Sequence, residues 1–107
     1  MAYKLIVTEH ADELIDNLVG YLIKKLKNPD AALRLMDGLE SIYERLEESP
    51  MQFPESSDYF LRNRGYREAL VPKMRYRVIF RIESDTVYIV GVFHTLEDFA
   101  EKLRQNP

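Results

Sequence analysis

The stretch Arg75–Ile82 constrains the fold of this chain most strongly, because its side chains alternate in character without interruption. Its apolar members share one side of an extended chain: Tyr76, Val78, Phe80 and Ile82. The other side carries the remaining residues: Arg75, Arg77, Ile79 and Arg81. A period of two is typical of a strand with one face on an apolar core. The stretch therefore predicts a sheet with an apolar face and an arginine face.

A second strand is predicted at Val87–His94, after four polar residues that suit a tight turn. If Ser84 and Asp85 form the turn, Arg75 lies opposite His94. Opposed residues share a face of the sheet. His94 is thus expected on the arginine face with Tyr88, Val90 and Val92, whereas Val87, Ile89 and Phe93 are expected on the apolar face.

The first half of the chain predicts a strand followed by two helices. Tyr3–Val7 is the strand, and Thr8 is a candidate N-cap for the helix that follows. Apolar residues then recur at three- and four-residue steps as far as Leu26. Asn28-Pro29 suits the cap and first position of a second helix, which ends at Ser49-Pro50. The short connection predicts an antiparallel helical hairpin.

The second half predicts three strands and a short helix. Met51–Gly65 is expected to be a long loop, and Tyr66–Val71 a strand that precedes the two described above. In that strand, Arg67, Ala69 and Val71 are expected on the arginine face. Thr95 and Asp98 form a candidate capping box for a last helix, which contains Phe99 and Leu103. The class is α+β, a single domain over residues 1–107: strand, two-helix hairpin, three-stranded antiparallel meander, C-terminal helix.

Charge is distributed unevenly along an acidic chain, whose formal net charge is −3. Glu68 is the only acid between Phe60 and Ile82, a segment with seven basic residues. One interpretation is a site for phosphate or an acidic partner, and the other is a solvated sheet face. The absence of cysteine excludes disulfides and thiolate metal sites. With no signal-peptide pattern and no long apolar run, a cytoplasmic protein without membrane contact is expected.

The element order, together with Gly65–Glu68, Tyr76–Ile82 and the strand ending at His94, resembles the RelE/ParE superfamily. These proteins are toxins of bacterial type II toxin-antitoxin systems. One branch is similar to RelE and cuts mRNA, usually on the ribosome. The ParE branch shares the fold and inhibits DNA gyrase without cutting RNA. In both branches an antitoxin wraps the toxin and silences it.

Three functions remain open on this resemblance: a metal-free mRNA endoribonuclease that inhibits translation, a ParE-like gyrase inhibitor, and an inactive member that binds only an antitoxin. Arg77 and His94 favour the nuclease, which is the first hypothesis. Glu68 and Leu70, which stand where the best-known RelE toxins carry a lysine pair, favour the others.

The resemblance implies catalytic roles for Arg77, His94 and Arg67, with no cofactor and no metal. Arginine binds a phosphate through two nitrogens, and histidine transfers protons near neutral pH. Phosphate or partner contacts are expected from Arg75, Arg81, Lys73 and Tyr88. The expected partners are an antitoxin, and mRNA on the ribosome or DNA gyrase. Either the last helix or an antitoxin segment is expected to cover Ile79, Val90 and Val92.

Overall fold

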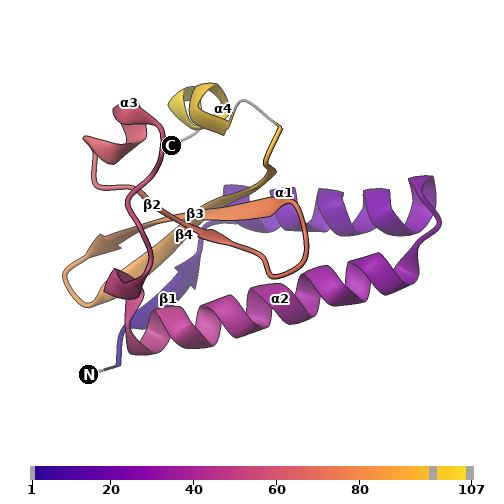
Figure 1. The fold of residues 1–107 in the computed structure, drawn as a ribbon, viewed down its shortest axis with the longest axis horizontal. Coiled ribbons are helices and arrows are strands. Elements are labelled where there is room, and N and C mark those ends of the chain that lie inside the picture. The colour runs from indigo at the N-terminus through magenta and orange to yellow at the C-terminus, as the bar shows by residue number, and fades with distance from the viewer. Residues whose placement is uncertain (1, 97–98, 106–107) are drawn as a thin grey trace.

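The computed structural model describes residues 2–96 and 99–105, in which a four-stranded sheet separates two groups of helices (Figure 1). Strands β2 (Arg67–Leu70), β3 (Tyr76–Glu83) and β4 (Thr86–His94) form the predicted antiparallel meander. Strand β1 (Lys4–Val7) pairs parallel to β4, so the strand order is β1-β4-β3-β2. The α+β class and the element order are confirmed.

Each helix of the helical hairpin begins at the residue predicted to cap it. Helix α1 (Glu9–Gly20) starts at Thr8, whose Oγ1 accepts a hydrogen bond of 3.2 Å from the amide of Ala11. Helix α2 (Pro29–Glu48) starts at Asn28, whose Oδ1 accepts from the amide of Ala31 at 3.1 Å. Each cap satisfies one amide that lacks a partner within the first helical turn. Between the helices the chain forms a π-helix, η1 (Tyr21–Lys25).

The segment predicted as a loop contains two short helical pieces, η2 (Pro50–Gln52) and α3 (Tyr59–Arg62). Asp58 caps α3, because its Oδ1 accepts from the amide of Leu61 at 3.0 Å. The last helix, α4 (Phe99–Gln105), is present as expected. The capping box predicted for it includes Asp98, which lies outside the described residues.

The sheet has an apolar cluster on each face. On one face, buried residues from the hairpin and the sheet pack together, including Leu22, Leu35, Leu39, Val78 and Phe80. On the other face, α3 and α4 cover the sheet through Leu61, Phe99 and Leu103 (Figure 1). Phe80 is fully buried on the hairpin face, as its place in the alternation predicts. Ile79 and Val90 are buried against α3 and α4, so the last helix covers them.

A β-bulge changes the predicted pairing of β3 with β4. The expected register holds near the turn, where Ile82 pairs with Val87 and Phe80 with Ile89. Val90 is then an additional residue, and Ile79 pairs with Gly91. Beyond this point every partner moves by one position, so His94 pairs with Tyr76 and Phe93 with Arg77. An extra residue in one strand reverses the face of all residues that follow it.

Three placements that assumed regular pairing of β3 with β4 are therefore wrong. Phe93 lies on the face covered by α3 and α4, and Val92 lies in the cluster beneath the hairpin. His94 lies on the hairpin face with Tyr76, on the opposite side of the sheet from Arg77. The predicted order of faces in β2 is also wrong, because Arg67 pairs with Phe80 and Glu68 with Ile79. Arg67 and Ala69 thus belong to the hairpin face, and Val71 packs in its core.

Candidate functional site

Arg77 lies in an enclosed setting between the sheet and α4. Its Nη1 lies 3.3 Å from both carboxylate oxygens of Glu68 and 3.3 Å from Oγ of Ser57. Its guanidinium carbon lies 4.6 Å from the ring centroid of Phe99. The side chains of Arg77 and Glu68 are only 15% and 13% exposed. The arginine predicted to bind a phosphate therefore already binds a carboxylate and an aromatic ring of its own chain.

The two residues expected to converge on a phosphate are separated by the sheet. His94 contacts Tyr76 edge-on, with ring centroids 5.4 Å apart. Its Nδ1 accepts a hydrogen bond of 3.1 Å from the amide of Leu96. These contacts fix the ring on the hairpin side of β4. The expectation that Arg77 and His94 share one cleft is wrong, because the bulge in β4 places them on opposite faces.

The other predicted site residues are also dispersed. Arg67 donates from Nη1 to the backbone carbonyl of Phe53 at 2.7 Å, a contact that ties β2 to the segment before it. Arg81 pairs with Glu83, and its guanidinium carbon lies 4.4 Å from the ring centroid of the half-buried Tyr88. Lys73 and Arg75 are exposed in and next to the turn between β2 and β3. These residues decorate several surfaces and do not line one pocket.

Glu68 was the residue to recognise in the sequence. It is the only acid in a basic segment, and it occupies the position on β2 that faces the same side as Arg77. An isolated acid among seven cations is a natural ion-pair partner for one of them. The polarity pattern of Tyr66–Val71 instead predicted Arg67, not Glu68, on the same face as Arg77.

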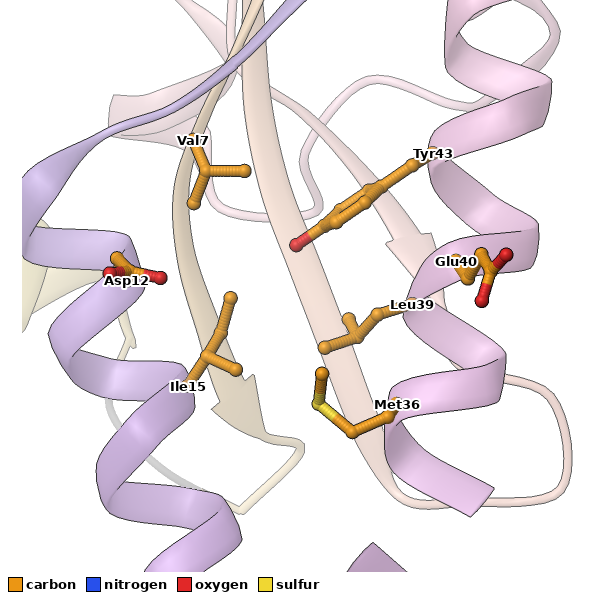
Figure 2. A pocket seen from close by; sticks show the side chains of 7 residues that line it. All are labelled: Val7, Asp12, Ile15, Met36, Leu39, Glu40 and Tyr43. Carbon is orange, nitrogen blue, oxygen red and sulfur yellow. The ribbon is translucent and has the colours of Figure 1, made fainter. Parts of the chain in front are cut away.

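A groove between the two long helices is a second candidate site (Figure 2). It has a volume of ≈ 240 Å³ and lies where α1, α2 and the end of β1 meet. Apolar side chains form most of it, and acidic residues complete the lining: Val7, Ile15, Met36, Leu39 and Tyr43 with Asp12 and Glu40. Figure 2 shows the hydroxyl of Tyr43 directed from α2 across the groove toward α1, the helix of Asp12.

The hydroxyl of Tyr43 is one of the polar groups in this groove, and it stays protonated. Burial, and after it the negative charge of Asp12, raise the pKa of Tyr43 from 10.0 to about 12. Both effects disfavour a tyrosinate, so the hydroxyl keeps its proton at any physiological pH. The groove therefore presents an apolar surface, a hydroxyl and a carboxylate. This combination suits a long cationic side chain, whose stem is apolar and whose head is charged.

Neither a metal-binding cluster nor a membrane-spanning helix is found among the described residues. The part of the chain described by the structure contains no group of three or more His, Asp or Glu residues placed to bind a metal ion. Within the same residues, no helix combines the length and apolar character needed to cross a membrane.

Comparisons with solved structures show the fold. The chain is similar to a chromosomal ParDE toxin-antitoxin system from P. aeruginosa, with 17% identity and a TM-score of 0.69 over 87% of this chain and 96% of that one. A toxin-antitoxin complex, RelBE2 from Mycobacterium tuberculosis, aligns with 20% identity and a TM-score of 0.59 over 88% and 99% of the two chains. A double arginine-to-alanine mutant of the E. coli toxin RelE in the free state aligns over the full length of both chains, with 14% identity and a TM-score of 0.66.

Sequence comparison identifies the family. No curated protein matches the sequence significantly. A family model described as ParE toxin of the type II toxin-antitoxin system parDE matches residues 5–99, which include β2, β3, β4, both long helices and all of β1 except Lys4. The chain therefore belongs to the ParE toxin family of type II toxin-antitoxin systems.

Proposed function

We propose that this protein is a toxin that acts by binding its target, that the target is DNA gyrase, and that a cognate antitoxin silences it. Gyrase is the target that the resemblance to ParE toxins implies. The observation that carries the proposal is the setting of Arg77, whose guanidinium is paired with Glu68 and stacked on Phe99. An arginine already neutralised within its own chain is poorly suited to stabilise a transferring phosphate.

RNA cleavage by Arg77 and His94 is the competing hypothesis. Such a reaction needs a cation for the phosphorane and a proton donor or acceptor within hydrogen-bond reach of the same phosphate. The pairing of β3 with β4 places the two residues on opposite faces. The nuclease hypothesis therefore requires a rearrangement of both α4 and the β4 bulge, whereas target binding requires neither.

The antitoxin is expected in the groove between α1 and α2. The surface first expected to bind it, formed by Ile79, Val90 and Val92, is buried within this chain. The groove is open and combines Asp12 with apolar side chains and the Tyr43 hydroxyl. Charge complementarity favours an antitoxin segment that presents a lysine or arginine flanked by apolar residues.

Two assays on the wild-type toxin separate these functions. Purified toxin is expected to block supercoiling by gyrase, and cells that express it are expected to show growth arrest without new mRNA ends in primer extension. Fragmentation of mRNA without loss of supercoiling would favour the nuclease. A folded toxin that is inactive in both assays, yet binds its antitoxin, would be the inactive member.

Substitutions at the two former catalytic candidates sharpen the test. His94→Gln removes proton transfer and retains hydrogen bonding. Arg77→Met combined with Glu68→Gln removes both charges, so that no unpaired buried carboxylate remains. In the proposed function, both variants stay toxic as long as circular dichroism shows the native fold. In a nuclease, each should lower the cleavage rate on the order of a hundredfold.

A further inference from the structure

The end of the helical hairpin exposes apolar side chains that its monomeric fold does not cover. Tyr21, Ile23 and Leu26 are 49%, 45% and 53% exposed, and Leu33 on the first turns of α2 is 63% exposed. Single exposed apolar residues are ordinary on protein surfaces, but several in one short segment indicate an interaction site. We call this segment, Tyr21–Asn28 with Leu33, the hairpin tip.

The local backbone explains why these residues face outward. The amide of Leu26 bonds to the carbonyl of Tyr21 at 3.1 Å, the spacing of a π-helix. The wider turn interrupts the apolar stripe of α1, so Leu22 stays buried while its neighbours turn to the surface. Lys27 then adopts a positive φ of 51°, which is uncommon for a residue with a side chain. Single π-helical turns occur frequently at functional sites.

The tip is also strongly basic in an acidic protein. Lys24, Lys25 and Lys27 are exposed, and no acid lies between Asp16 and Asp30. Figure 1 shows the tip projecting beyond the sheet, at the far end of the hairpin from the N-terminus and from α3 and α4. A projecting, basic and apolar segment is well placed to enter a depression on another molecule.

We infer that the hairpin tip is the surface by which this toxin binds its target, and that it docks on an acidic protein surface with an apolar depression. This inference rests on the proposed function, in which the toxin acts by binding its target, and it assigns the target to a surface other than the groove proposed for the antitoxin. The three lysines specify an acidic partner, and Tyr21, Ile23 and Leu26 supply the apolar anchors that usually dominate binding. The groove at Asp12 and Tyr43 has the opposite charge and selects a basic segment.

Variants at the tip should separate target binding from antitoxin binding. One variant replaces apolar anchors (Ile23→Ser with Leu26→Ser), and another reverses charge without touching the packing (Lys24→Glu with Lys25→Glu). The matched control, Met51→Ser with Lys4→Glu, changes an exposed apolar residue and an exposed lysine at the other end of the molecule. Growth arrest, the concentration that half-inhibits gyrase, and antitoxin affinity are measured for each protein, and circular dichroism verifies the fold.

Each tip variant should lose growth arrest and require about tenfold more toxin to inhibit gyrase, while its antitoxin affinity stays within about twofold of the wild type. The control should match the wild type in all three measurements. Tip variants that remain fully toxic, or that lose antitoxin affinity instead, would overturn the inference. A second outcome would also overturn it: the wild type binds phosphatidylglycerol vesicles, the tip variants do not, and the variants still arrest growth. The tip would then bind membranes and not the target. If the wild type arrests growth without inhibiting gyrase, the proposed target fails, and loss of arrest in the tip variants still supports the tip.

Discussion

Arg77 gains its contacts from residues far apart in the sequence, namely Ser57, Glu68 and Phe99. In the low-dielectric space under α4, this set replaces much of the hydration that the guanidinium loses. Its Nε is nevertheless buried without a hydrogen-bond partner among the described residues. Arg77 therefore connects three elements: its own strand β3, β2 through Glu68, and α4 through Phe99. Its charge is directed into the protein and not toward solvent. A residue type that suggests phosphate binding has a structural role in this fold.

The raised pKa of Tyr43 predicts how the stability of the protein changes at alkaline pH. Its pKa in the folded protein is about 12, against 10.0 for an ordinary tyrosine, because burial and Asp12 disfavour the anion. A raised pKa means that the folded state holds the proton more tightly. The associated stability is fully present below pH 10 and is lost as the pH rises toward 12.

Urea denaturation of the wild type and Tyr43→Phe at pH 9 and at pH 12 measures this effect. Between these pH values the wild type should lose about 1–2 kcal/mol more stability than Tyr43→Phe, after allowance for solvent screening of a partly exposed group. Contributions that the two proteins share cancel in the difference. An identical pH dependence for the two proteins would show that Tyr43 is open to water.

At the level of elements, local signals in the sequence predicted where the long helices begin and where the chain turns between β3 and β4. Thr8, Asn28 and the Ser84-Asp85 turn all behave as their residue types indicate, and Ser84 adopts the positive φ of 56° that a two-residue turn needs. Such signals are short-range, because a cap or turn is decided within a few residues. The alternation of β3 likewise predicted the burial of Phe80 correctly.

The bulge in β4 was not predictable in the same way, although Gly91 was a signal for it. An extra residue in a strand depends on packing across the sheet, and no local pattern fixed it. Gly91 and Phe93 lie on one face, and a Cβ added to Gly91 would lie 2.3 Å from Cε2 of Phe93. Glycine inside a strand frequently marks such a close approach. The error displaced His94 and Phe93 together, and with them the whole predicted site.

Substitution of Gly91 tests this account of the bulge. Gly91→Ala should destabilise the protein by about 1–3 kcal/mol, because the buried ring of Phe93 cannot move away without loss of packing under α4. Combining it with Phe93→Leu should produce less destabilisation than the sum of the two single changes. Chemical denaturation of the four proteins measures the coupling. Strict additivity would mean that the ring and the glycine are not in contact.

At the scale of the whole molecule, charge and apolar surface are divided between two ends of the hairpin. The groove beside β1 is acidic and open, and the tip is basic and projects from the body (Figure 1). Met36 of the groove and Leu33 of the tip are both exposed and lie one helical turn apart on α2, so the two regions are neighbours. An antitoxin that occupies the groove would keep the target away from the tip by its bulk, without contacts to the tip residues. One binding event would then silence a toxin whose target surface is elsewhere.

Substitutions of two carboxylates one helical turn apart test whether the groove binds the antitoxin. Asp12→Asn removes the charge that lines the groove, whereas Asp16→Asn removes an equal charge from the exposed surface of α1. Antitoxin affinity should fall about three- to tenfold for Asp12→Asn and stay unchanged for Asp16→Asn, because only Asp12 contacts the cationic side chain.

Titration calorimetry at two salt concentrations adds a second readout. Wild-type affinity should fall with added salt, and Asp12→Asn should reduce that dependence because a charge pair has been removed. Equal losses in both variants would indicate general attraction to an acidic protein, and the groove would then not be the antitoxin site.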